Sequence, residues 1–253
     1  MRIGAQLYTV RNYCKDKGSF AETLKKIADI GYGFVQVSGT CAYEAEWLRD
    51  RLSENGLKCV ITHYNADAVR NDTEKVIADH KTFGSKLIGL GSIPAPFASS
   101  KDYEGFAAAY RTAAEKIARE GCYLMYHNHH FEFERDEKGI RGIEKLASSF
   151  SPGEMGFTLD TFWIQYGGGD PAEWIKTLSG RVPAIHVKDL SIVGGAQRMA
   201  VIGEGNINFD RVFYEAERAG TEYMLVEQDD CYGEDPFECL SRSFEYLRSC
   251  GFN

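Results

Sequence analysis

A strict alternation of two patterns constrains this chain more than any other feature. Short apolar runs rich in β-branched and aromatic residues alternate with amphipathic stretches at roughly 30-residue intervals along the sequence. The expected strands are Ile3–Thr9, Phe34–Val37, Cys59–His63, Leu87–Leu90, Cys122–His127, Met155–Leu159, Ala184–Val187 and Met224–Glu227. The expected helices are about Ser19–Ile30, Tyr43–Asn55, Asn71–Phe83, Asp102–Glu120, Gly142–Ser149, Pro171–Leu178, Asp210–Ala219 and Pro236–Cys250. Because parallel strands need crossover connections, the alternation predicts a parallel sheet.

Eight such units in 253 residues match the size of a (β/α)8 barrel. An open, doubly wound sheet is the alternative, but it usually has fewer strands. The chain also lacks a GxGxxG turn after its first strand. No linker or low-complexity segment divides the sequence. We therefore predict an α/β protein that forms one (β/α)8 TIM barrel domain over residues 1–253, with a functional or mobile glycine-rich loop at Ser191–Asn208.

Composition narrows the partners and the compartment. The formal net charge is −8, and no run of basic residues occurs, which argues against nucleic-acid and anionic-membrane partners. No stretch approaches the ~18 apolar residues of a membrane helix, and Met1–Gln6 does not begin a signal peptide. The seven cysteines are scattered without a CxxC pair, as expected for reduced thiols. These features predict a cytoplasmic location.

Polar side chains collect at the carboxyl ends of the expected strands, where barrels of this kind place their active sites. These residues are Gln6, Tyr8, His63, His127, His129, Glu132, Asp160, His186, Lys188, Asp189, Glu227, Gln228 and Asp229. Of six histidines, only His80 falls within a helix, where we expect it at the surface. Random placement would spread histidines over helices and loops. The concentration therefore predicts an active site at this end of the barrel.

Metal binding is the chemistry that best suits these groups. His127 and His129 lie two apart, so an extended strand directs both to one face, and Glu132 follows after a short turn. Imidazole and carboxylate at one strand end can bind a divalent metal or move protons. Asp160, His186 and Glu227 end three further strands and can converge on the same axis. Carboxylates with imidazole suit Mn²⁺, Mg²⁺, Co²⁺ or Zn²⁺. The alternatives are a helix-capping Asp160 and a hydrogen-bonded core His186.

Other residues at the same end are candidates for substrate binding. Lys188 lies on the same strand face as His186 and can hold an oxyanion, with a salt bridge to Asp189 as the alternative. Trp163 and Tyr8 can supply flat walls for a sugar ring, with ordinary packing as the alternative. Gln6 and His63 complete this set at the ends of the first and third strands. No compact phosphate cradle is evident.

Motifs at five of these strand ends and in one following loop carry a resemblance. They are GAQLYTVR at Gly4–Arg11, YHNH and FEF at Tyr126–His129 and Phe131–Phe133, LDTFW at Leu159–Trp163, HVKD at His186–Asp189, GEGNI at Gly203–Ile207 and VEQD at Val226–Asp229. The chain resembles the sugar phosphate isomerase/epimerase branch of the xylose-isomerase-like barrel superfamily. The resemblance implies a metal bound by Asp160, His186, Glu227 and an acid after strand five. Ketose epimerases of this superfamily carry that acid on the strand itself, where this chain has YHNH. Glu132 is the first choice for the fourth ligand, and His127 or His129 the second.

The resemblance also implies an activity. It indicates a sugar isomerase or epimerase that removes a proton next to a carbonyl through a metal-stabilised enediolate, with His127, His129, Glu227 and Lys188 as catalytic residues. Ketose 3-epimerases use two metal-bound glutamates as paired acid and base, which this chain lacks at strand five. Histidine-bearing relatives such as inosose dehydratases and 3-keto-glycoside lyases resemble this variant. A dehydratase or lyase acting on a keto-sugar or inosose is therefore the alternative.

Two further functions compete with these. Apurinic endonucleases share the barrel but need a histidine three residues after the strand-six aspartate, where this chain has Trp163. A non-catalytic binding barrel would not need carboxylates and imidazoles at five strand ends. The expected partner is a small carbohydrate, and the chain is a possible homo-oligomer.

Overall fold

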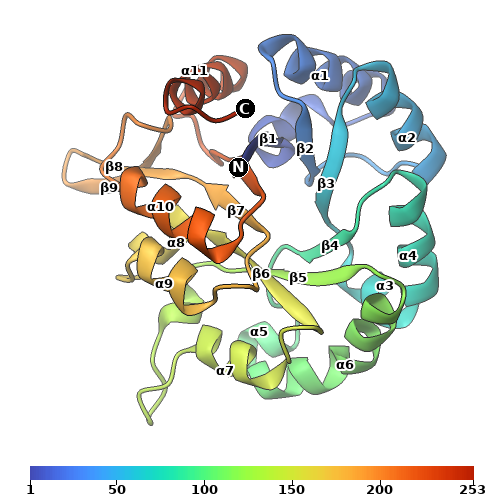
Figure 1. Cartoon of the computed structure of the whole chain (residues 1–253), viewed down its shortest axis with the longest axis vertical. Coiled ribbons are helices and arrows are strands. Elements are labelled where there is room, and N and C mark those ends of the chain that lie inside the picture. The colour runs from blue at the N-terminus through green and yellow to red at the C-terminus, as the bar shows by residue number, and fades with distance from the viewer.

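The barrel predicted from the alternation is present. The computed structural model describes residues 1–253, and eight parallel strands close in the order β1-β10-β7-β6-β5-β4-β3-β2 inside a ring of helices (Figure 1). The barrel strands are β1 Arg2–Gln6, β2 Phe34–Val37, β3 Lys58–His63, β4 Leu87–Leu90, β5 Tyr123–His127, β6 Met155–Asp160, β7 Ala184–Val187 and β10 Tyr223–Val226. The predicted fold class, a TIM barrel, is confirmed.

The helices follow the predicted stretches, with additions. They are α1 Lys17–Ile30, α2 Ala45–Glu54, α3 Ala66–Asn71, α4 Thr73–Thr82, α5 Phe97–Ser100, α6 Tyr103–Arg119, α7 Gly142–Ser149, α8 Thr161–Tyr166, α9 Pro171–Thr177, α10 Phe209–Ala219 and α11 Pro236–Ser249. Short 3-10 helices cover η1 Leu7–Tyr13 and η2 Phe131–Phe133. None of these helices combines the length and the apolarity that crossing a bilayer requires.

Two local predictions differ from the structure. The first strand ends at Gln6 rather than Thr9, because the Gln6 side chain accepts a hydrogen bond from the Tyr8 amide (3.2 Å) and starts η1. The expected loop at Ser191–Asn208 contains most of an antiparallel hairpin, β8 Asp189–Val193 and β9 Ala196–Ala200. Its turn is Gly194-Gly195, and both glycines have positive φ angles.

His80 is not at the surface as expected. It is fully buried in α4, where its Nε2 lies 2.8 Å from the Thr62 hydroxyl and its Nδ1 lies 2.7 Å from the Val76 carbonyl. Both ring nitrogens therefore have partners, which makes burial of the imidazole tolerable. Burial lowers the pKa of His80 to about 4, so the ring is neutral at pH 7.

The barrel interior is polar at the carboxyl end of the strands and apolar below that end. Its apolar part, here called the apolar plug, consists of Val60, Ile61, Met125, Ala184 and Leu225 and is separate from the large core between the sheet and the helices. Side chains alternate along each strand, so the residue two positions after each plug residue also points inward. For Met125, Ala184 and Leu225 these residues are His127, His186 and Glu227. The apolar plug therefore confines the charged groups to the carboxyl end of the barrel.

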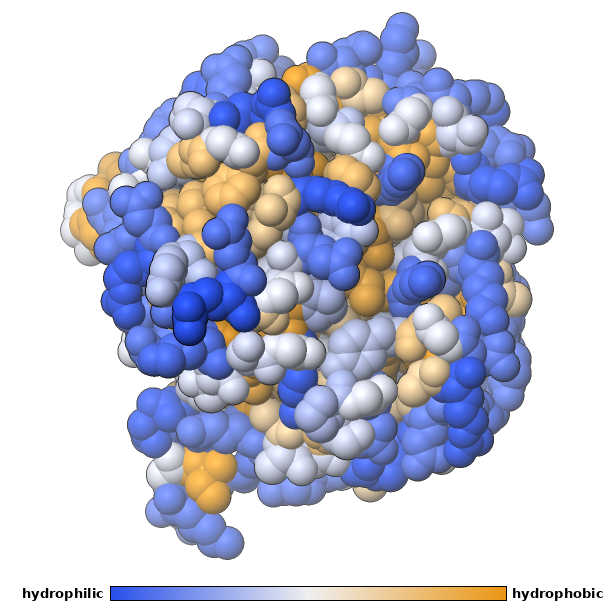
Figure 2. All heavy atoms as spheres, viewed as in Figure 1, coloured by the Kyte–Doolittle hydropathy of each residue, from blue (hydrophilic) through white to orange (hydrophobic).

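The outer face of the ring is mostly polar. In the view of Figure 2, hydrophilic side chains cover the perimeter and apolar ones lie nearer the centre. A loop at residues 135–141, between η2 and α7, projects at the lower left of Figure 1. All seven cysteines are free thiols.

Candidate metal centre and active site

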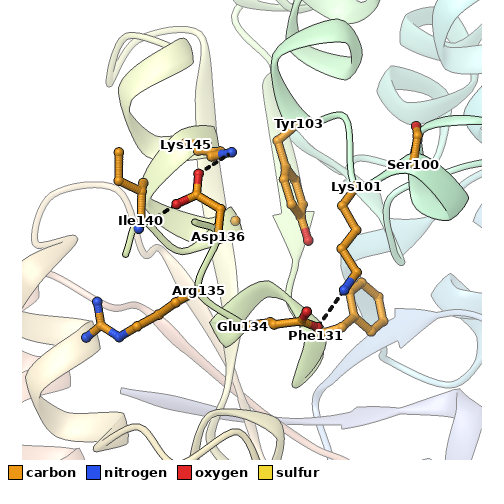
Figure 3. A pocket seen from close by; sticks show the side chains of 10 residues that line it. Ser100, Lys101, Tyr103, Phe131, Glu134, Arg135, Asp136, Ile140 and Lys145 are labelled. Carbon is orange, nitrogen blue, oxygen red and sulfur yellow. Dashed lines mark hydrogen bonds and ion pairs between the residues drawn. The ribbon is translucent and has the colours of Figure 1, made fainter. Parts of the chain in front are cut away.

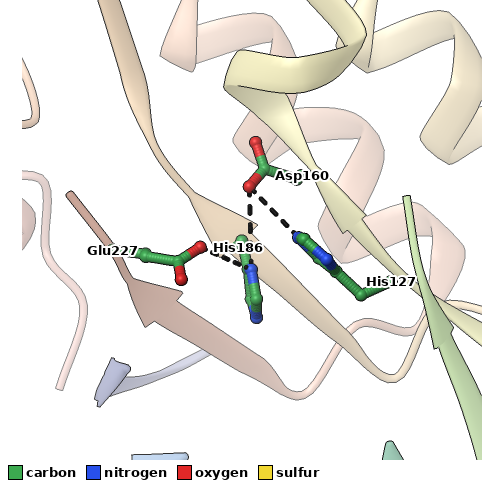
Figure 4. Close-up of side chains that lie close together, drawn as sticks. All are labelled: His127, Asp160, His186 and Glu227. Atoms are coloured by element: carbon green, nitrogen blue, oxygen red, sulfur yellow. Dashed lines mark hydrogen bonds and ion pairs between the residues drawn. The ribbon is translucent and has the colours of Figure 1, made fainter. Parts of the chain in front are cut away.

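Four buried side chains converge at the carboxyl end of the barrel. His127 ends β5, Asp160 ends β6, His186 lies in β7 and Glu227 directly follows β10, so they come from consecutive strands of the barrel (Figure 4). One donor atom from each lies within 4.8 Å of all the others. The structure thus brings together three of the four predicted ligands, with His127 as the fourth member.

The distances centre on two carboxylate oxygens. Asp160 Oδ2 lies 3.3 Å from His127 Nε2 and 3.7 Å from His186 Nδ1, while Glu227 Oε2 lies 2.9 Å from His186 Nδ1. The other oxygen of Asp160 accepts a hydrogen bond from the Trp163 amide (2.9 Å) and caps α8. Asp160 therefore does both things that the sequence suggested. Its Oδ1 caps α8, and its Oδ2 belongs to the group of donor atoms.

Hydrogen bonds outside the group fix which ring nitrogens face it. His127 Nδ1 lies 3.0 Å from the Gly91 carbonyl, which can only accept, so this nitrogen carries the proton. His186 Nε2 lies 2.7 Å from Gln36 Oε1 and donates to it. In the neutral rings, the lone pairs of His127 Nε2 and His186 Nδ1 therefore point toward carboxylates. Such lone pairs repel carboxylate oxygens unless a cation lies between them.

The buried atoms fit a metal ion. His186 Nδ1 has no hydrogen-bond partner of acceptable geometry despite its short distance to Glu227. Although burial disfavours the charged ring, Glu227 and Asp160 raise the pKa of His186 to about 9. The negative charge of these two carboxylates also attracts a metal cation to His186 Nδ1. Two imidazoles with two carboxylates are a donor set suited to a divalent metal ion.

Glu132, the first choice for the strand-five ligand, is not part of this group. Its fully buried carboxylate accepts hydrogen bonds from the Tyr126 hydroxyl (2.5 Å) and the His129 amide (2.8 Å). Tyr126 points away from the barrel interior and packs against Phe106 of α6. The η2 turn thus returns Glu132 to the outer layer, whereas His127 points inward. Burial raises the pKa of Glu132 to about 7.

Lys188 is held against the acidic side of the site. Its Nζ lies 2.7 Å from Asp229 Oδ2, 3.3 Å from Glu227 Oε2 and 3.5 Å from Asp160 Oδ2. Although burial disfavours its charge, these three carboxylates raise the pKa of Lys188 above its ordinary value. Lys188 is therefore charged at pH 7. Any substrate anion that its ammonium binds must lie next to these three carboxylates.

The alternative partner of Lys188, Asp189, has a different role. The Asp189 carboxylate accepts hydrogen bonds from backbone amides, including those of Gly203 (3.0 Å), Gly205 (2.9 Å) and Ile207 (3.2 Å). It therefore fixes the GEGNI loop rather than pairing with Lys188. Gly205 is required there, because a Cβ would come within 2.4 Å of Asp189 Oδ1.

An open cavity of about 550 Å³ lies over the site. Of the predicted substrate-binding residues, Tyr8, His63, Trp163 and Lys188 line it, as do His127, His129 and Glu227. Gln6 does not line the cavity. It is fully buried, and its Oε1 is engaged with the Tyr8 amide.

The comparison with family models matches residues 24–250, nearly the whole barrel, to the xylose isomerase-like TIM barrel. The chain belongs to this family. A "sugar phosphate isomerase/epimerase" from Parabacteroides distasonis ATCC 8503 superposes with a TM-score of 0.81 at 22% identity, covering 98% of this chain and 93% of that one. That likeness shows the shared fold.

Two curated relatives have similar identities to this chain and share one name. The chain is 22% identical to "Inosose dehydratase" of Mesomycoplasma hyopneumoniae (strain 7448), over 91% of this chain and 88% of the relative. It is 23% identical to the protein of that name from Clostridium perfringens (strain 13 / Type A), over 92% and 90%. This xylose isomerase-like barrel is thus similar to dehydratases as well as to isomerase/epimerases, and it carries a buried group fit to hold a metal ion.

Three imidazole rings line the cavity at the ends of β3 and β5. The ring centroid of His127 lies 5.1 Å from that of His63 and 4.7 Å from that of His129. Burial lowers the pKa of His129 to about 3, and burial with the neighbouring imidazoles lowers the pKa of His63 well below its ordinary value. Both rings are therefore neutral at pH 7 and able to hydrogen-bond hydroxyl groups.

Sequence reasoning missed one residue of this barrel site and undervalued another. Gln36, the partner of His186, is fully buried in β2, and Asp229 lines the cavity beside Lys188. A polar residue between Val35 and Val37 in an apolar strand was the available signal for Gln36. Asp229 was visible two residues after Glu227, on the same side of an extended chain.

Proposed function

We propose that this protein is a divalent-metal-dependent lyase that eliminates water or an alcohol β to the carbonyl of a polyhydroxylated substrate. The observation that carries this proposal is the asymmetry of the cavity walls. Both carboxylates that line the cavity, Glu227 and Asp229, follow β10. The walls from β3 and β5 supply the imidazoles of His63, His127 and His129 and no carboxylate.

This asymmetry fits elimination better than epimerisation. Inverting a carbon centre requires one group to remove a proton and another to deliver a proton on the opposite face, for which paired carboxylates suit. Elimination requires a base for one proton and a group that protonates the leaving oxygen. Here the strand-five position that carries a glutamate in ketose epimerases carries His127. A carboxylate base is therefore present on the β10 wall only, which suits elimination because it needs one carbon base and not two.

The residues can be assigned roles. His127, Asp160, His186 and Glu227 would hold the ion, which would polarise the carbonyl and stabilise the negative charge that develops beside it. Lys188 would donate a hydrogen bond to the developing oxyanion. Asp229, beside Lys188, is placed to accept the proton from the carbon next to the carbonyl.

Elimination balances without an added reactant. The C–H electron pair forms the new C=C bond, and the bond from the β carbon to oxygen breaks. The leaving oxygen takes up the proton that Asp229 removed from carbon and departs as water or an alcohol, which returns Asp229 to its carboxylate form. His63 and His129 would hold the hydroxyl groups on the wall opposite Asp229, which orients the C–H bond toward the carboxylate. The curated relatives named inosose dehydratase support this reaction class.

Isomerisation or epimerisation of a sugar is the second candidate. Asp229 favours it, because this second carboxylate lines the same cavity and lies 2.7 Å from Lys188. A proton removed by one group would then return to carbon instead of leaving with oxygen.

One experiment separates the two. Candidate inososes, ketoses and 3-keto-glycosides are incubated with protein and Mn²⁺ in D₂O and followed by proton NMR. We expect loss of one C–H and formation of an α,β-unsaturated carbonyl with ultraviolet absorbance. An epimer or isomer carrying one deuterium, with no unsaturated product, would refute the lyase proposal, and an undeuterated isomer would indicate a hydride shift.

A further inference from the structure

The geometry points to a second binding subsite beside the metal centre, an aromatic shelf of His130, Trp163 and Tyr166 that takes a second, uncharged ring of the substrate. This inference rests on the proposed function, because the second ring would be the alcohol that elimination releases. The substrate class would then be a two-ring compound such as a keto-glycoside rather than a free monocyclic ketone.

The shelf begins at the metal site. Asp160 caps α8, Trp163 lies in its first turn and Tyr166 ends it, so one short helix connects the metal group with the shelf. The Lys188 ammonium lies 5.2 Å from the centre of the Trp163 ring, which itself lines the cavity. A ligand held by Lys188 and the ion would therefore extend directly over Trp163.

The shelf continues outward as touching rings. The centroids of Trp163 and Tyr166 lie 5.6 Å apart, and His130 lies 5.2 Å from each of them. One face of Tyr166 stacks on the buried Phe162, yet 44% of Tyr166 stays exposed. An exposed, packed aromatic surface at the rim of a cavity is suited to stacking against the apolar face of a pyranose ring.

The cavity is larger than one ring requires. Twelve heavy atoms, the number in a hexose, would fill about 360 Å³ at most if each took the roughly 30 Å³ of a liquid water molecule. The cavity, which Trp163 lines, measures about 550 Å³. It therefore has room for more than one ring.

The surroundings of the shelf favour an uncharged occupant. Phe131 stacks on His129 and separates the cavity from a depression of about 210 Å³. Within that depression, Lys101 pairs with Glu134 and Lys145 pairs with Asp136 (Figure 3). These two pairs are mutually neutralised, and the remaining charged side chain of the depression, Arg135, donates a hydrogen bond to the Gly139 carbonyl (2.5 Å).

The test compares one-ring and two-ring sugars on the Mn²⁺-saturated protein. Methyl β-glucoside and cellobiose, which lack the ketone and are not consumed, are titrated by calorimetry. Saturation-transfer NMR identifies the ring that contacts the protein. We expect cellobiose to bind about tenfold more tightly, the gain that one ring stacked on an aromatic surface typically provides.

Variants locate the effect. Tyr166→Ala should abolish the preference for cellobiose while leaving Mn²⁺ affinity and methyl glucoside binding unchanged. Tyr214→Ala, at an exposed tyrosine on α10 that does not line the cavity, should change nothing. Equal affinities in the wild type, no binding of either sugar, or a preference that survives Tyr166→Ala would overturn the shelf. Because these readouts need no turnover, they fail independently of the D₂O experiment.

Discussion

The two halves of the barrel mouth differ in charge. Strands β5, β6, β7 and β10 are consecutive in the barrel and end in the metal group, with Lys188 and Asp229 beside it. We call this the charged half. At the same end, β1 ends in Gln6, β2 carries Gln36 next to its last residue, β3 ends in His63 and β4 ends in Leu90, so this half has amides, a neutral ring and an apolar side chain. We call this the neutral half.

The two halves meet at a hydrogen bond. Gln36 reaches across to His186 Nε2 and so turns the Nδ1 lone pair toward Asp160 and Glu227. The charged half would hold the ion, and the neutral half sets the protonation pattern of its ligands. The geometry of the metal group therefore depends on Gln36, a residue outside that group.

The largest effect should come from removing a donor of the charged half. We expect Glu227→Gln and His186→Ala to lose bound Mn²⁺ and to lower turnover about a thousandfold or more, since both the ion and its charge balance are disturbed. Metal content measured by mass spectrometry checks this. Unchanged stoichiometry in either variant would remove that residue from the ligand set, and no divalent ion bound by the wild type would favour a non-catalytic barrel.

Lys188→Met should separate binding of the ion from catalysis. The variant keeps the length of the side chain but loses the ammonium that faces Asp160, Glu227 and Asp229. We expect turnover to fall about a hundredfold, the scale of losing one oxyanion donor, while Mn²⁺ affinity stays equal or rises. A parallel loss of metal would instead make Lys188 a structural part of the metal centre.

Gln36→Leu breaks the link between the halves. Metal affinity should fall about 10- to 100-fold, as for other partners of metal-bound histidines. At a pH above about 9, where the metal-free ring of His186 is neutral, nitrogen-15 NMR should show a mixture of tautomers in the leucine variant. Gln36→Glu, which retains an acceptor, should preserve the Nε2–H tautomer. Unaltered affinity and tautomer in the leucine variant would contradict the proposed coupling.

We expect the smallest effect on metal binding from substituting Glu132, and this substitution tests whether Glu132 lies outside the charged half. Glu132→Gln should leave Mn²⁺ content unchanged, because its carboxylate faces Tyr126 and the His129 amide. The folded state raises the pKa of Glu132 to about 7, so the folded protein retains a proton that the unfolded chain releases near pH 4.5.

The pH dependence has a defined sign. The stability linked to Glu132 is fully present below about pH 4.5 and is lost as pH rises through 7, by about 2–3 kcal/mol. Urea unfolding of wild type and Glu132→Gln across this range measures the difference, with the exposed Glu134→Gln as control. A wild type that gains stability relative to Glu132→Gln between these pH values would contradict the assignment.

Much of the fold was predictable because periodicity reports which faces are buried. Phe34–Val37, Leu87–Leu90 and Ala184–Val187 are strands over the predicted residues, and Gly142–Ser149 is a helix with the predicted bounds. The errors lie where a side chain redirects the backbone or is buried with partners. Gln6 starts η1 by bonding the Tyr8 amide, and His80 is buried because Thr62 and Val76 satisfy its ring.

The sequence by itself determined the barrel, the end of the barrel that carries the polar groups, and the convergence of Asp160, His186 and Glu227. Each follows from local pattern, since a residue at the carboxyl end of a barrel strand lies at the mouth whatever its neighbours are. The tertiary structure brings His127, and not Glu132, into the group of donor atoms. Adjacent residues of a strand face opposite sides of the sheet, and only the packing of Tyr126 against α6 shows which side Glu132 rejoins. It also placed Gln36 beside His186, 150 residues away. The apolar strand around Gln36 marks it as a buried polar residue, but nothing local in the sequence names the partner that it contacts across the barrel.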